Sequence, residues 1–106
     1  MSKQIRQGDL LFEELDSKPS AKLRKTDTVV IEYGETTGHA HRLADKDTTS
    51  LFENEDTKVI DYLEVLKPAT IVHDTHQPIT LHKGRWAVIR QESLTLRERE
   101  PRRVND

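Results

Sequence analysis

The 106-residue sequence contains no cysteine. Disulfide bonds, thiolate metal sites, iron–sulfur clusters and cysteine nucleophiles are therefore excluded. Apolar residues are also scarce, because hydrophobic side chains account for 33% of the chain and glycine for only four residues. This share is below the roughly 45–50% of an ordinary globular domain. A chain this short and this polar can form only one small domain with a thin core.

The sequence also lacks a charge excess and any long hydrophobic run. Seventeen basic residues against nineteen acidic ones leave a net charge of -2. Because the opposite charges nearly cancel, a folded chain is favoured over a disordered one. The lack of an excess of basic residues argues against nucleic acid as a partner. No run approaches the roughly 18 apolar residues of a membrane helix, and residues 1–4 lack the apolar stretch of a signal peptide. We therefore expect a cytoplasmic protein without membrane contact.

Short segments rich in β-branched and aromatic residues indicate strands. The clearest are residues 28–33, 59–66 and 69–73. Pro68 separates the last two, because proline cannot donate a ladder hydrogen bond. Residues 78–90 predict a hairpin with its turn at residues 83–84. Shorter strands are expected at residues 8–15, at 39–43 and from residue 51.

Apolar residues nowhere recur at helical spacing over more than about two turns. We predict an all-β fold, a small barrel or sandwich formed by residues 1–96. Residues 97–106 hold four arginines and form an Arg-rich tail, which we interpret as a solvated terminus. Tyr33, Tyr62 and Trp86 are assigned to the core. A thin core with several short strands also makes a homodimer plausible.

Two histidines in the segment Gly38-His39-Ala40-His41 form the first candidate site. In a strand the side chains of a His-x-His pair point to the same face, roughly 6–7 Å apart, so both imidazoles can reach one metal ion. His39 and His41 share parity with Ile31 and Tyr33 in the preceding predicted strand. We therefore expect both histidines to extend an inward-facing apolar stripe.

A second pair of histidines ends another stripe. Ala69, Ile71 and His73 share a face, and His76 follows in the turn. Two strands that each end an inward stripe with histidine would bring three imidazoles together, and His76 could supply a fourth. The sequence predicts a divalent metal site with open positions. Imidazole binds Zn, Fe, Ni and Mn alike, so the metal is not identified.

Other polar residues were assigned less central roles. Glu35 shares the parity of the histidine pair and is a candidate for an additional ligand or a general base, and Asp45 is a candidate for an additional carboxylate ligand. Asp74 points to the other face from His73 and is placed to orient an imidazole.

The remaining histidine and two arginines are expected outside the site. His82 lies off the inward parity and is expected to be exposed. Arg42 and Arg90 are interpreted as members of surface ion pairs. A hydrogen-bonded or pH-responsive histidine cluster, or unrelated surface histidines, are the alternatives to the metal site.

The segment Gly38-His39-Ala40-His41, followed by Asp45, resembles the first motif of the cupins. In that family a His-x-His pair, a later carboxylate and a histidine from a second motif hold a divalent metal inside a small β-barrel. The second cupin motif is not recognisable, so the resemblance implies that His73 or His76 replaces its histidine.

Most of the chain is similar to a group of small, uncharacterised bacterial and phage proteins. The shared motifs are Gln7-Gly8-Asp9, Gly38-His39-Ala40-His41-Arg42, His73-x-x-His76-x-Pro78-Ile79, Gly84, Arg90-Gln91-Glu92 and Arg102-Arg103-Val104-x-Asp106. The segment from Pro78 to Trp86 also resembles a hairpin of the β-clip nucleotide hydrolases, whose catalytic motifs are missing. A β-clip-like fold is therefore the alternative architecture.

Two functional hypotheses follow. In the first, the protein is cupin-like and binds a divalent metal in a histidine-lined pocket, with a small polar molecule as ligand or substrate. In the second, a non-enzymatic β-barrel binds a protein or nucleic acid through its tail, and the histidines are structural. Because apolar stripes end in histidines, the first hypothesis implies that chelation lowers the stability of the domain.

Overall fold

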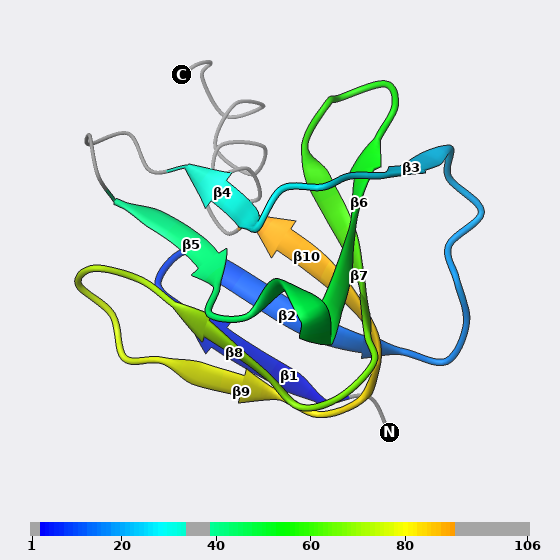
Figure 1. Ribbon diagram of the computed structural model, residues 1–106. Coiled ribbons are helices and arrows are strands. Elements are labelled where there is room, and N and C mark those ends of the chain that lie inside the picture. The colour runs from blue at the N-terminus through cyan, green and yellow to red at the C-terminus, as the bar shows by residue number, and fades with distance from the viewer. Residues whose placement is uncertain (1–2, 34–38, 91–106) are drawn as a thin grey trace, which may run out of the picture.

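The computed structural model describes residues 3–33 and 39–90, which form ten strands and one short 3-10 helix in two antiparallel sheets (Figure 1). The six-stranded sheet has the order β1-β2-β10-β7-β6-β3, and the four-stranded sheet has the order β4-β5-β8-β9. The elements are β1 (Gln4–Gln7), β2 (Leu10–Leu15), β3 (Leu23–Lys25), β4 (Val30–Tyr33), β5 (Ala40–Leu43), η1 (Lys46–Thr48), β6 (Thr49–Asn54), β7 (Ile60–Val65), β8 (Ala69–Val72), β9 (Ile79–Leu81) and β10 (Gly84–Arg90).

The two sheets form a sandwich with one hydrophobic core between them. Alternate residues of the central strands point inward, as Leu10 and Phe12 do in β2 and Ala69 and Ile71 do in β8. Both sheets contribute to the same buried cluster. The predicted all-β class is confirmed, and the sheets remain an open sandwich rather than a closed barrel. The fully buried large side chains are Trp86, Tyr62, Phe12, Leu10, Leu51, Leu63, Ile71 and Leu81.

The hairpin predicted over residues 78–90 is wrong. Its two strands exist, but β9 pairs with β8 in one sheet while β10 pairs with β2 and β7 in the other. Gly84, at φ 150°, adopts a backbone conformation that other residues rarely take, where the chain crosses between the sheets. The indole N–H of Trp86 donates to the carbonyl of His82 across this crossing. The turn signal was therefore real, but it marks a change of sheet.

Two strands escaped the sequence analysis because they are polar edge strands. In β1 only Gln7 is buried, and β3 has no buried residue. Each pairs with a single neighbour, β2 and β6 respectively. Edge strands are stabilised by backbone hydrogen bonds to one side, so they do not require the apolar alternation that predicts a strand.

The core assignment of Tyr33 is also wrong, because this side chain is 74% exposed. A register shift between Val30 and Glu32 interrupts the pairing of β4 with β5. A bulge changes which residues of a strand face inward, so parity counted along the sequence fails beyond it. Ile31, which lies between Val30 and Glu32 at the register shift, is buried as predicted.

Arg90 connects the two sheets at the end of β10. Its guanidinium donates to Glu32 Oε1 at 2.7 Å, Asp61 Oδ1 at 3.1 Å and the carbonyl of Ile60 at 2.7 Å. Only 16% of its side chain is exposed. Since Glu32 belongs to β4 and Asp61 to β7, this arginine links the edge strand of the smaller sheet to the larger sheet. The predicted ion pair of Arg90 exists, but it is largely buried instead of lying at the surface, because the side chain is enclosed between the two sheets.

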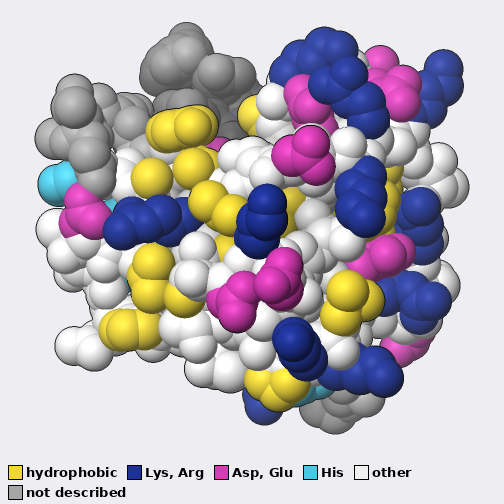
Figure 2. Space-filling model, viewed as in Figure 1, with side chains coloured by type: hydrophobic (Ala, Val, Ile, Leu, Met, Phe, Trp, Pro, Cys, Tyr) yellow, Lys and Arg dark blue, Asp and Glu magenta, His cyan; other side chains and the backbone are white. Residues whose placement is uncertain are grey.

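The described surface is strongly mixed in charge. Figure 2 shows Lys and Arg side chains interspersed with Asp and Glu over the face in view, with apolar side chains in scattered groups. Within residues 3–33 and 39–90, no helix has the length and hydropathy needed to span a membrane.

Candidate functional site: a histidine cluster at one end of the sandwich

Three segments meet at the left of Figure 1, at one end of the sandwich. They are the β1–β2 turn, the start of β5 and the loop between β8 and β9. Because β5 and β8 run antiparallel, with Arg42 opposite Val72 and Leu43 opposite Ile71, the start of one strand lies beside the end of the other. This topology brings His39 and His41 next to His73.

The four histidines predicted as ligands come together here. The ring centroids of His41 and His73 lie 4.3 Å apart, and those of His73 and His76 lie 4.8 Å apart. His41 and His76 are stacked at 6.4 Å, and His39 lies 6.0 Å from His73. His73 is thus the ring that contacts all three others. His41 is 2% exposed, whereas His39 and His73 are half-buried and His76 is exposed.

Gln7 determines the protonation pattern of the His41 ring. The side-chain amide of Gln7 donates to the carbonyls of Ile71 and Gln77, both at 2.9 Å. Its oxygen, Oε1, is therefore the atom that lies 2.8 Å from His41 Nδ1. An amide oxygen can only accept, so Nδ1 of His41 carries the hydrogen. In neutral His41 the other nitrogen, Nε2, is then an unprotonated lone-pair donor available to a metal.

Asp9 faces this unprotonated nitrogen. Its Oδ1 lies 3.4 Å from His41 Nε2, and its side chain is 57% exposed. Burial and, next, the neighbouring His73 lower the pKa of His41, and this outweighs the opposing influence of Asp9. Near neutral pH the imidazole is therefore uncharged, so two electron-pair donors face each other without a hydrogen between them.

His73 has the opposite hydrogen arrangement. The backbone N–H of Thr75 donates to His73 Nδ1 at 3.1 Å, and the Thr75 hydroxyl lies 3.3 Å from the same nitrogen. Because a backbone N–H can only donate, Nδ1 holds the lone pair and neutral His73 carries its hydrogen on Nε2. Burial and then the adjacent His76 lower the pKa of His73, so its neutral form prevails at pH 7.

Gly8 allows His76 to approach the β1–β2 turn. Its φ of 60° lies in the left-handed region, and a Cβ built at this position would be 2.6 Å from His76 Nε2. No side chain fits this close to the imidazole without moving it. The residue type of the turn and the placement of His76 are therefore linked.

Replacing Gly8 with alanine is expected to destabilise the fold by about 1 kcal/mol or more and to displace the His76 ring, because left-handed backbone is costly for residues with a Cβ. Urea unfolding and NMR of the imidazole would measure the two effects. In a His76→Ala background the same replacement should cost less, since the colliding ring is gone. An equal loss in the free energy of unfolding in both backgrounds would show that the contact between residue 8 and His76 does not affect stability.

The remaining predicted residues lie elsewhere or have other partners. Asp45 lies beyond the far end of β5 and caps η1 by accepting from the N–H of Asp47. Asp74 lies 3.6 Å from Arg42 in an ion pair, as expected for that arginine, so its partner is a guanidinium in place of the predicted imidazole. Glu35 and the tail at residues 97–106 lie outside the described residues.

His82 is separate from the cluster, as predicted. Its Nε2 lies 2.8 Å from Glu14 Oε2, and its side chain is 44% exposed. The hydrogen bond from His82 lowers the pKa of Glu14. His82 therefore serves as a natural control for experiments on the other histidines.

Sequence reasoning missed Gln7 and Asp9 as site residues. Both lie at least thirty residues from the first histidine, and the pairing of β1 with β2 places them beside β5. The segment Gln7-Gly8-Asp9 is one of the shared motifs, but its residue types alone indicate no role. The available signal was a glycine between two polar residues, because glycine permits tight turns and the close approach of another group.

The separations between the rings are compatible with a shared metal ion. An imidazole bound at about 2.1 Å has its ring centre about 3.2 Å from the ion, so two ligand rings lie at most about 6.4 Å apart. All four measured ring separations fall within this limit. As the described side chains stand, however, no three His, Asp or Glu residues form a group that could hold a metal.

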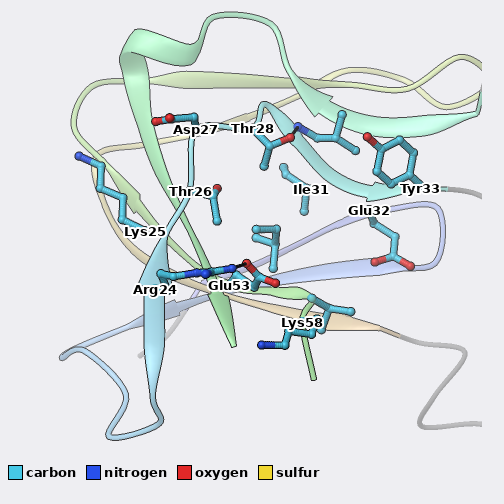
Figure 3. Close-up of a pocket in the computed structure, with 13 residues that line it drawn as sticks. Arg24, Lys25, Thr26, Asp27, Thr28, Ile31, Glu32, Tyr33, Glu53 and Lys58 are labelled. Carbon is cyan, nitrogen blue, oxygen red and sulfur yellow. Dashed lines mark hydrogen bonds and ion pairs between the residues drawn. The ribbon is translucent and has the colours of Figure 1, made fainter. Parts of the chain in front are cut away.

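A cleft of about 550 Å³ lies elsewhere in the sandwich, beside β3, β4 and the β6–β7 hairpin (Figure 3). Ile31 points into it, Tyr33 lies at its side, and the ion pair of Arg24 with Glu53 crosses its base. None of the five histidines lines it. Its volume is within the usual range for small-molecule sites.

The family model of a domain of unknown function (DUF8820) matches residues 6–91. The chain belongs to this family, and the matched segment includes the β1–β2 turn and all four clustered histidines. No curated protein and no solved structure shows a significant match.

Proposed function

We propose that the histidine cluster binds one divalent transition-metal ion. The observation that carries the proposal is the 3.4 Å separation of His41 Nε2 from Asp9 Oδ1. Two ligand atoms that each lie about 2.1 Å from an ion at a tetrahedral angle are about 3.4 Å apart. The distance is long for a charge-assisted hydrogen bond, and the hydrogen on His41 is already directed to Gln7.

Three further features support this proposal. His41 is held in one tautomer by the buried amide oxygen of Gln7, which occupies the position that a carboxylate or backbone carbonyl takes beside a metal-bound imidazole. Burial favours the neutral form of the ring, which a metal requires. The rings of His73 and His76 lie within coordination range, and at least one exposed ring must rotate to complete the site.

The donor set also limits the metal. Neutral imidazoles with one carboxylate suit Zn, Fe, Ni and Mn, and the absence of cysteine removes thiolate ligands. An ion that keeps an open position could act as a Lewis acid on a small polar molecule, as in the cupin-like hypothesis. The tail-binding alternative concerns residues outside the described part of the chain.

Replacing Asp9 with asparagine tests the proposal, because the amide keeps the shape of the side chain but loses its charge. We expect zinc affinity, measured by isothermal titration of untagged protein, to fall at least about 10-fold. Asp45→Asn is the matched control: it changes an exposed aspartate that caps η1, and asparagine caps helices equally well. Equal affinities for the wild type and both variants would refute the assignment of Asp9.

A further inference from the structure

The cleft beside β3, β4 and the β6–β7 hairpin lies where the sandwich is open. In the described part of the chain, β3 and β4 are the outer strands of their sheets, and each pairs with one neighbour. Apolar side chains line the inner part of the cleft, where Ile31 and Ile60 are buried and Val59 is half-buried. Figure 3 shows Ile31 pointing into the space. A volume of about 550 Å³ can hold the apolar body of a small molecule between the two edge strands.

Two of the carboxylates that line the cleft are already neutralised. Glu53 accepts a hydrogen bond from Arg24 at 2.7 Å, and Glu32 accepts one from Arg90 at the same distance. Both carboxylates are partly buried in these pairs, with 16% and 31% of their side chains exposed. Because each already faces a guanidinium, neither opposes the entry of an anion as a bare carboxylate would.

The remaining charged side chains leave one end of the cleft cationic. Within residues 3–33 and 39–90, Lys25, Asp27 and Lys58 line the cleft without an ion pair. Figure 3 shows Asp27 and Lys58 at opposite ends of the cleft, and Lys25 pointing away from its centre. The acidic residues of the neighbouring turn, Glu55 and Asp56, are exposed and do not line the cleft. Lys58 therefore provides an ammonium group that no described carboxylate engages.

Lys58 reaches this position through an unfavourable backbone conformation. Its φ of 65° lies in the left-handed region, which favours glycine. Asn54 fixes the turn, because its side chain accepts from the N–H groups of Asp56 and Thr57 and its carbonyl accepts from the N–H of Lys58. Strained backbone that the surroundings hold in place is concentrated at functional sites. Glycine would take this turn with less strain, but it would remove the ammonium group from the cleft.

We infer that this cleft binds a small organic carboxylate, with the anionic group on the Lys58 ammonium and a planar apolar body packed over Ile31. Tyr33 supports the planar body, because its ring lies at the side of the cleft and is 74% exposed, which leaves an aromatic surface for stacking. None of the five histidines lines the cleft, so this inference is independent of the metal proposal.

Three indole compounds test the preference for an anion, because they share one planar body and differ in charge. Indole-3-acetate is an anion, indole-3-acetamide is neutral and tryptamine is a cation at pH 7. Each is titrated into the ¹⁵N-labelled full chain with excess chelator, and the NMR shifts of the backbone amides are followed. We expect indole-3-acetate to bind at least about threefold more tightly than the amide, and tryptamine to bind most weakly. The largest shifts should occur at Thr26, Ile31 and Lys58.

Three results of these titrations would overturn the inference. They are equal affinities for indole-3-acetate and tryptamine, shifts centred on residues outside the cleft, and absence of saturable binding of indole-3-acetate. Because chelator is present throughout, none of them bears on the metal site, and failure of the metal proposal leaves this result unchanged.

Replacing Lys58 with glycine should have two effects of opposite sign. The urea midpoint of the free protein should rise, because glycine takes the left-handed conformation without strain. The affinity for indole-3-acetate should fall about threefold, as expected for the loss of one exposed ion pair. Lys67→Gly changes the net charge equally outside the cleft and should keep the affinity. Unchanged affinity in Lys58→Gly, or an equal loss in Lys67→Gly, would contradict the role of Lys58.

Discussion

Replacing His41 with alanine will weaken zinc binding at least about 100-fold. His41 offers the one ring nitrogen whose lone pair is fixed toward Asp9, through the bond from Nδ1 to Gln7. Loss of an outer partner alone typically costs 10–100-fold in metal affinity, so loss of the ligand should cost more. Isothermal titration with Zn²⁺ at pH 7.5 measures the effect.

The control for this replacement is His82→Ala, which removes a partly exposed histidine that pairs with Glu14 outside the cluster. We expect this variant to bind zinc like the wild type. Because His41 is buried, His41→Gln provides a second, less disruptive variant, and circular dichroism checks that both remain folded. Retained zinc affinity in folded His41→Gln and His41→Ala would contradict the proposed ligand set.

Replacing Arg90 with alanine will lower the free energy of unfolding by about 2–3 kcal/mol. The side chain is largely buried and makes three hydrogen bonds, two of them to carboxylates. Its loss leaves Glu32 and Asp61 partly buried without their partner, and breaking a buried pair typically costs about 3–5 kcal/mol, less where water can enter. Urea unfolding gives the value.

Arg24 provides a matched comparison. It also forms a 2.7 Å ion pair with a glutamate, Glu53, but its own side chain is 63% exposed. Exposed pairs contribute little, so Arg24→Ala should leave the urea midpoint nearly unchanged. Equal destabilisation by the two replacements would contradict the expectation that a buried ion pair stabilises this fold more than an exposed one.

The sequence predicted the fold class and the inward-facing stripes that end in histidine because both depend on local alternation, whereas the meeting of the histidines depends on the pairing of β5 with β8. Ala69, Ile71 and His73 share a face in a regular strand, and so do His41 and Leu43. Alternation is a local property, so it survives in any sheet that buries one face. It failed at Tyr33, where a register shift interrupts β4.

Long-range pairing could not be predicted in the same way. The Lys83-Gly84 turn looks the same whether it closes a hairpin or sends the chain to the other sheet, and only the partners of β9 and β10 distinguish the two. Gln7 and Asp9 enter the site for the same reason, through contacts with residues more than thirty positions away. Asp45 shows the opposite error, because closeness in sequence to His41 does not bring it to the same end of β5.

The most direct test of the account is the metal content and stability of untagged protein. Native mass spectrometry after incubation with Zn²⁺ should show one ion per chain, and saturating Zn²⁺ should raise the melting temperature relative to protein in chelator, because a ligand that binds only the folded state stabilises it. A chain that takes up no metal, and melts at the same temperature with zinc as with chelator, would contradict the account.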